Sequence, residues 1–145
     1  AATVEKLIQR LTGHPINIPK TYVDNLNLVV TQSMVRLPNG KDGRRIVSIN
    51  EIVGYDPSSD SFSFIEVFRW NPTSDTFEFT GYMNSYLLEE VIALKRGMPA
   101  QRKREIYGEL TRRGNILRRL GEQGITDFYD LYQVLSKAVR EGVFG

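Results

Sequence analysis

Apolar and polar residues alternate through much of the segment 43–81. Phenylalanines stand at positions 62, 64 and 68 and again at 77 and 79, with Ser, Thr, Glu or Arg among them. A period of two is typical of a β-strand with one buried face. We therefore expect an antiparallel β-meander with most of these aromatic side chains in its core. Other elements must then cover its apolar face.

The same segment contains an internal repeat. Residues 55–64 read Tyr-Asp-Pro-Ser-Ser-Asp-Ser-Phe-Ser-Phe, and residues 70–79 read Trp-Asn-Pro-Thr-Ser-Asp-Thr-Phe-Glu-Phe. Pro57 and Pro72 preset φ for a turn, and Asp56 and Asn71 can accept a hydrogen bond from the backbone two residues on. Each copy therefore predicts a tight β-turn. The acids of the turns shape the backbone, and no carboxylate pair is spaced as a catalytic acid and base.

A helix and a strand are expected before this segment. Val4, Leu7, Ile8 and Leu11 share one helical face, so we expect a helix from the first residues to the Gly-His-Pro at 13–15. Thr21 has the spacing of a capping box, which favours one short helical turn before Leu26. The run 28–36 predicts a strand. Hairpin signals follow at Asn-Gly 39–40 and Asp-Gly 42–43.

From residue 84 the apolar period changes to 3.6, which predicts three helices. They run from a cap at Asn84 or Ser85 to Gly97, from about Ala100 to Leu120, and from a cap at Thr126 or Asp127 onward. Gly108 and Gly114 weaken the second helix and suggest close packing there. The residues expected to face inward are Ile106, Tyr107, Leu110, Leu117, Leu120, Phe128, Leu131, Tyr132, Leu135 and Val139. The order of elements predicts an α+β fold.

Composition excludes several classes of site. The 145 residues include no cysteine and a single histidine, His14, so neither a thiolate zinc site nor a histidine metal pair is expected. No apolar run approaches the roughly 18 residues of a membrane span, and no signal peptide is visible. The chain begins without Met inside an expected helix. We therefore expect it to be a piece of a longer polypeptide.

The net charge is only +2, but arginines are concentrated in one expected helix. This helix, Arg102 to Arg119, could contact nucleic acid or anionic membrane in a free-standing basic module. Glutamates at 105, 109 and 122 are interleaved with the arginines, which favours a solvated, salt-bridged face. A subunit interface is a third interpretation, because long arginine side chains suit one. Binding to nucleic acid is the less favoured outcome.

No phosphate loop is present in the sequence. The run Asn-Gly-Lys-Asp-Gly at 39–43 lacks the Gly-x-x-x-x-Gly-Lys-[Ser/Thr] spacing that wraps phosphates ahead of a helix. A hairpin is the better interpretation of this run.

Several runs together resemble the C-terminal end of archaeal type II/IV secretion-system ATPases, the motors that assemble archaella and type IV pili. The runs that carry the resemblance, which extends over nearly the whole chain, are residues 7–13, 15–19, 28–32, 44–57, 68–72, 109–117 and 124–128.

The resemblance implies a cytoplasmic hexameric ring, peripheral at the inner face of the membrane, that binds ATP and magnesium and drives a membrane platform protein. In that pattern the Walker A loop, acidic box, Walker B carboxylate and histidine box all lie upstream of the position matching Ala1. The resemblance therefore implies that residues 1–145 alone do not hydrolyse ATP, because the nucleotide and Mg²⁺ lack their cradle. No cofactor, metal site or catalytic residue is expected in this chain itself.

By the same resemblance, residues 1–53 correspond to the end of a RecA-like domain and include the terminal strands of its sheet. Residues 54–81 form the meander, and residues 84–145 form a C-terminal helical subdomain whose three helices cover the sheet. The residues expected nearest the nucleotide side or a subunit boundary are Gln32, Arg36, Arg44 and Arg45. Reasoning from the residues alone leaves an alternative open, in which these side chains tie strand ends to acidic turns.

Overall fold

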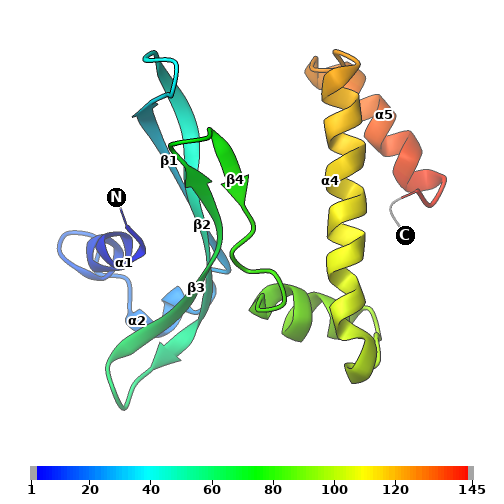
Figure 1. Cartoon of the computed structure of the whole chain (residues 1–145). Coiled ribbons are helices and arrows are strands. Elements are labelled where there is room, and N and C mark those ends of the chain that lie inside the picture. The colour runs from blue at the N-terminus through cyan, green and yellow to red at the C-terminus, as the bar shows by residue number, and fades with distance from the viewer. Residues whose placement is uncertain (1–2, 144–145) are drawn as a thin grey trace. The chain divides into compact units, whose positions relative to one another are not determined.

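The computed structural model describes residues 3–143 and has an α+β fold (Figure 1). Its strands form one four-stranded antiparallel sheet in the order β1-β2-β3-β4. The strands are β1 (Leu28–Arg36), β2 (Asp42–Asp56), β3 (Ser61–Asn71) and β4 (Thr76–Glu78). The predicted α+β class and antiparallel meander are confirmed. The first two residues of the expected opening helix lie outside the described residues.

The chain divides into two compact units, Ala1–Pro99 and Ala100–Gly145. The first contains the sheet, the helices that precede it and the helix that follows it, and the second is helical. The expected division into 1–53, 54–81 and 84–145 stays a prediction, as do the RecA-like relation of the sheet and its three-helix cover.

The β1–β2 hairpin turns at only one of its two sequence signals. The Leu37 N–H donates to the Lys41 carbonyl at 2.8 Å, and Gly40 adopts a left-handed φ of 79°. Asp42 already begins β2, so the Asp-Gly signal at 42–43 belongs to the strand and not to the turn. Extended backbone at these residues continues the ladder to β1, where Gly43 pairs with Val35.

A helix covers one face of the sheet and forms the core with it. Helix α1 (Val4–Thr12) is capped by Thr3, whose hydroxyl accepts from the Lys6 N–H at 3.2 Å. The buried side chains of this core are Val4, Ile8, Val23, Val29 and Ile52, with Phe62 and Phe64 packed against them. The short helix α2 (Lys20–Val23) has no side-chain cap, so the predicted capping box at Thr21 is wrong.

The later aromatic residues are less buried than the alternation predicts. Phe68 and Phe79 stack with ring centroids 4.5 Å apart. Phe77, however, is 56% exposed, and β4 ends at Glu78, one residue before Phe79. The expectation of a core position is therefore wrong for Phe77, because no described element covers its side chain on this short edge strand.

The first helix after the sheet matches the sequence prediction. It consists of a π-helical segment, η1 (Leu87–Ile92), that continues into α3 (Ala93–Lys95). The Ser85 hydroxyl caps it by accepting from the Leu88 N–H at 3.0 Å. Gly97, at a φ of 67°, lets the Met98 N–H reach the Ala93 carbonyl at 3.0 Å and ends it.

The second unit contains η2 (Ala100–Glu105), α4 (Ile106–Glu122) and α5 (Phe128–Arg140). Asp127 caps α5 as predicted. Ile106 and Tyr107 are buried, but Leu117 and the inward face expected of α5 are not, and no described residue of α5 is buried. The prediction of close packing at Gly108 and Gly114 is also wrong, because a Cβ added to either would meet no described atom within 4 Å.

Candidate functional site

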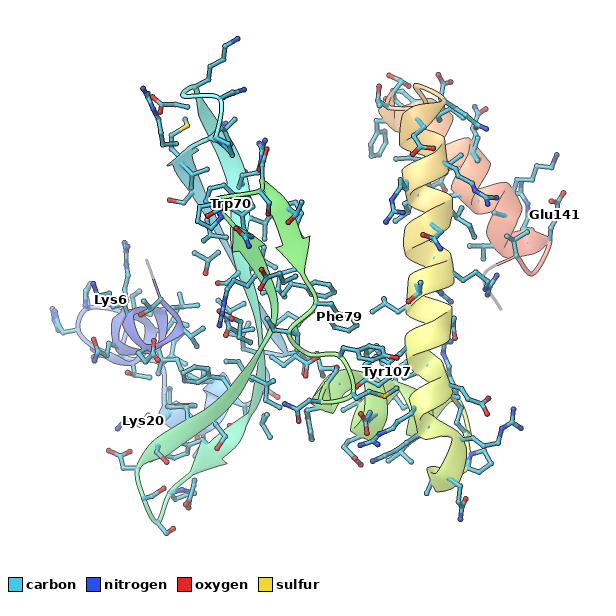
Figure 2. All side chains as sticks on the ribbon, viewed as in Figure 1. Lys6, Lys20, Trp70, Phe79, Tyr107 and Glu141 are labelled. Atoms are coloured by element: carbon cyan, nitrogen blue, oxygen red, sulfur yellow. The ribbon has the colours of Figure 1, made fainter. Side chains whose placement is uncertain are left out.

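The four polar residues singled out from the sequence separate into two groups. Arg45 binds the β3–β4 turn: its Nε and Nη2 each donate to one carboxylate oxygen of Asp75 at 2.7 Å. Trp70, on β3 (Figure 2), donates its Nε1–H to the same carboxylate at 2.8 Å. The hydrogen bonds from Arg45 and then Trp70 lower the pKa of Asp75 from 3.8 to about 2. Arg45 is therefore committed to a structural ion pair.

Arg36 is also paired, at the turn end of the β1–β2 hairpin. Its guanidinium donates to the Asp42 carboxylate at 3.1 Å, and both side chains are exposed. The geometry of Arg36 and Arg45 matches the alternative interpretation from the sequence, in which arginines tie strand ends and acidic turns together. To bind a ligand, Arg45 would have to break two short hydrogen bonds, whereas Arg36 uses only its Nη1 in an exposed and weaker pair.

Gln32 and Arg44 are brought together instead. In the ladder, Met34 pairs with Arg44 and Gln32 with Ile46, so these residues belong to one sheet face. A shallow hollow on that face is lined by Gln32, Ser33, Met34 and Arg44. Among the described residues, no hydrogen bond or ion pair occupies the side chain of Gln32 or Arg44. The hollow therefore offers one guanidinium and one amide that no described residue binds, and we call such groups uncommitted.

The hollow is flanked by apolar residues on the same face. Leu28 and Val30 alternate with the buried Val29, which faces the core, and they are 46% and 53% exposed. Met34 and Ile46 are also exposed. We call this surface the arginine patch and define it by Leu28, Val30, Gln32, Met34, Arg44 and Ile46. The sequence signal for it was the run 28–30, whose two faces are both apolar.

A second surface lies on the other face of the sheet, beside α1. It is a cleft, here called the α1 cleft, lined among others by Glu5, Ile8, Gln9, Thr12, Phe62 and Phe64. At one end Lys20 Nζ contacts both carboxylate oxygens of Asp60 at 2.7 Å. The Glu5 carboxylate makes no hydrogen bond or ion pair with any described residue. Sequence reasoning missed this cleft, because its residues come from distant segments.

Glu51 is a buried acid that the sequence did not mark as special. It lies on β2, is 3% exposed, and accepts from the Ser85 hydroxyl at 2.5 Å and the Leu87 N–H at 3.1 Å. The carboxylate thereby satisfies backbone and hydroxyl donors at the start of the helix that follows the sheet. These contacts make Glu51 a structural cap and not a free catalytic acid.

The arginine-rich helix is partly neutralised. Arg102 donates to both oxygens of Glu105 at 2.6 and 2.7 Å, and Arg113 donates to Glu109 at 2.7 Å. These pairs fit the salt-bridged interpretation of the helix. Arg118 and Arg119 stay exposed.

Residues 3–143 also show no metal cluster and no membrane-spanning helix. They contain no group of three or more His, Cys, Asp and Glu side chains arranged to hold a metal ion. None of their helices combines the length and hydropathy that a membrane crossing requires.

Comparison with known proteins gives two archaeal relatives from Methanocaldococcus jannaschii. The chain is 43% identical over its whole length to Uncharacterized protein MJ0900, and it covers 26% of that protein. It is 46% identical over 121 residues, 83% of the chain, to Uncharacterized protein MJ1287, and the match covers 42% of that protein. The chain thus spans less than half the length of both relatives. No family model matches it.

Proposed function

We propose that this chain is the C-terminal part of a secretion or pilus-assembly motor ATPase, where it supplies ring packing and platform docking and is not itself catalytic. The resemblance in seven runs between residues 7 and 128, which include 44–57, 68–72 and 109–117, motivates the proposal. The two relatives are compatible with it, because each carries the matching sequence within a much longer chain.

The structural observation that carries the proposal is the exposed apolar row on the edge strand β1. This strand is at the edge of the sheet, and on one face Leu28, Val30 and Met34 are 46%, 53% and 61% exposed. An edge strand with an uncovered apolar row is an aggregation hazard unless another element pairs with it or covers it. A neighbouring domain or subunit of a larger assembly would do so.

The residues present do not fit a nucleotide site of their own. A triphosphate with magnesium requires a backbone cradle, a lysine and a metal-holding carboxylate, none of which is recognisable in the sequence. The arginine patch offers one uncommitted guanidinium among apolar side chains. ATP and magnesium therefore belong, in this proposal, to the upstream part of the parent protein.

In this function the parent is a homo-hexamer at the cytoplasmic face of the membrane and acts on a membrane platform protein. The chain's own contribution is to hold domains and subunits in register, so that ATP hydrolysis elsewhere is converted into motion. Gln32 and Arg44 are its best placed polar contacts, because the structure leaves them uncommitted.

The test uses the natural polypeptide that contains this sequence. An antibody raised against the chain should detect a polypeptide several times heavier than 16.6 kDa in a lysate of the source organism. That polypeptide, once purified, should hydrolyse ATP with magnesium, and the 145-residue chain should not. Magnesium-dependent turnover by the isolated chain, or a native band near 16.6 kDa, would refute the proposal.

A further inference from the structure

The arginine patch and the α1 cleft lie on opposite faces of one sheet, within the unit Ala1–Pro99. Val29 and its neighbour Val30 show the division: Val29 belongs to the core against α1, and Val30 is 53% exposed. On the side of α1, Ile52 pairs with Phe64, which lines the cleft. The two surfaces therefore lie on opposite faces of one sheet, the patch on β1 and the start of β2 and the cleft beside β3.

The two surfaces are complementary in charge. The patch has an uncommitted guanidinium, that of Arg44, and the cleft has an uncommitted carboxylate, that of Glu5, among the described residues. Lys20, the cation among the residues that line the cleft, is already paired with Asp60. Arginine and carboxylate groups form strong hydrogen-bonded pairs, which give an interface its orientation.

The two surfaces are also complementary in their apolar parts. The patch presents Val30, Met34 and Ile46 around its polar centre, all at least 40% exposed. The cleft is lined by the buried Ile8 and the half-buried Phe62 and Phe64, together with the exposed Glu5 and Gln9. Protein–protein interfaces typically bury such apolar groups, with aliphatic and aromatic side chains next to an arginine.

We propose that the arginine patch of one copy of this chain docks on the α1 cleft of a second copy, with Arg44 paired to Glu5 across the contact. Because the two surfaces differ, the contact is heterologous, and each copy uses its patch toward one neighbour and its cleft toward the other. Such head-to-tail contacts generate closed rings or open filaments. The inference rests on the proposed function only in expecting a closed ring. In that ring, patch and cleft form one of the contacts between neighbouring subunits.

A phosphate-bearing ligand fits the patch less well. Phosphate sites combine several cations with backbone N–H groups at a loop or helix start. Here Arg36 and Arg45 are held by aspartates, and the flanks are apolar. A partner surface with its own apolar groups removes those flanks from water, whereas a phosphate leaves them exposed.

The test is a charge exchange in the whole chain, read as self-association in sedimentation velocity over a series of protein concentrations. Arg44→Glu and Glu5→Arg should each weaken self-association roughly tenfold or more, because each places like charges together. The double variant, Arg44→Glu with Glu5→Arg, should restore association to near the wild-type level, because it rebuilds the pair with its polarity reversed.

Arg10→Glu is the matched control. Arg10 is an exposed arginine on the same helix as Glu5, but it does not line the cleft, so its reversal should leave association unchanged. The thermal unfolding midpoint of each variant shows whether it is folded. Because Glu5 lies in the first turn of α1, Glu5→Gln is a milder second variant that should also weaken association.

Each result of these measurements either supports or overturns the proposed contact. Rescue in the double variant supports the contact. Loss in both single variants without rescue overturns it, and so does an unchanged association in either single variant. If only Arg44→Glu acts, the patch contacts a surface of the second copy other than the cleft, which also overturns the pairing of Arg44 with Glu5. None of these results depends on ATP hydrolysis. Self-association therefore tests the contact, and ATP hydrolysis by the natural polypeptide tests the proposed function separately.

Discussion

Asp75 and Asp60 occupy the same position in the two copies of the sequence repeat, and they make the same kinds of bond. Each has a left-handed φ, 52° and 51°, and each accepts from the aromatic residue that begins its repeat and from a distant cation. For Asp75 the donors are Trp70 and Arg45, and for Asp60 they are Tyr55 and Lys20. The repeat is therefore a repeated hydrogen-bonding unit.

The first prediction concerns the loss of stability in acid. Hydrogen bonds from Ser58 and Ser59 lower the pKa of Asp56 from 3.8 to about 2, and those from Arg45 and Trp70 do the same for Asp75. A carboxyl whose folded pKa is depressed contributes stability that is present above its unfolded pKa and is lost as the pH falls toward the folded one. The free energy of unfolding should therefore decrease between about pH 4 and pH 2.

Urea denaturation at a series of pH values measures this decrease. Asp75→Asn and Asp56→Asn should each be less stable than the wild type at neutral pH and should show a shallower loss of stability in acid. A wild-type stability that is flat between pH 4 and pH 2 would contradict the assignment of these depressed pKa values.

The second prediction concerns Glu51. Glu51→Ala leaves the Ser85 hydroxyl and the Leu87 N–H without their acceptor in a buried place, which should cost about 1–3 kcal/mol. Glu51→Gln keeps one acceptor oxygen and should cost less. Hydrogen exchange is the direct measurement: in Glu51→Ala the amide of Leu87 should exchange faster. Unchanged exchange there would show that Glu51 does not hold the start of this helix.

The third prediction concerns two glycines. A Cβ on Gly81 would lie 2.5 Å from Val67 Cγ1 and 2.9 Å from its Cα, so Gly81→Ala should cost about 1–3 kcal/mol through overpacking. Gly54→Ala is the matched control, because a Cβ there meets no described atom within 4 Å. It should be neutral or stabilising by about 0.5 kcal/mol, since alanine loses less backbone entropy in a strand. Equal losses at both positions, measured by urea denaturation, would contradict this packing.

The fourth prediction contrasts a core residue with an exposed one. Ile52 is 3% exposed in the core against α1, and Ile52→Ala should cost about 2–5 kcal/mol. Phe128 is 73% exposed on α5, so Phe128→Ala should stay within about 0.5 kcal/mol of the wild type. A large loss at Phe128 in thermal unfolding would show that α5 packs as its apolar pattern suggests.

The fifth prediction concerns the alternative function of a basic module. With Arg102 and Arg113 held by glutamates, the chain should bind duplex DNA and anionic vesicles weakly, and less as salt rises. Glu105→Gln combined with Glu109→Gln should increase binding, because it removes two negative charges that lie beside Arg102 and Arg113. Tight binding by the wild type at physiological salt, measured by fluorescence anisotropy or vesicle co-sedimentation, would favour the basic module over the motor.

The sequence predicted best those elements that local chemistry determines. The strand 28–36, both Asx turns, the serine cap before Leu87 and the aspartate cap at 127 depend on residues near one another in the chain. It failed where exposure depends on distant packing. Phe77 and Phe128 have the right periodicity for a core, yet no described element covers them.

The candidate site was predicted only in part, for a related physical reason. The resemblance marked Gln32, Arg36, Arg44 and Arg45 as the polar residues nearest the nucleotide side or a subunit boundary, but it could not tell an arginine that an aspartate binds from one that no described residue binds. Asp75 decides that question, and it lies 30 residues from Arg45 in the chain. Nor could periodicity show that Glu5 and Phe64 border one cleft, because that proximity is created by the fold.

The order of the strands has a consequence for how this sheet is made. Each strand is hydrogen-bonded to the one that follows it in the chain, from β1 through to β4. Pairing between successive strands closes only short loops, which costs less entropy and favours rapid folding. On a ribosome, every hairpin can therefore form as soon as its second strand emerges, without waiting for a distant segment. Whatever polypeptide surrounds it, this meander can assemble from its own sequence order.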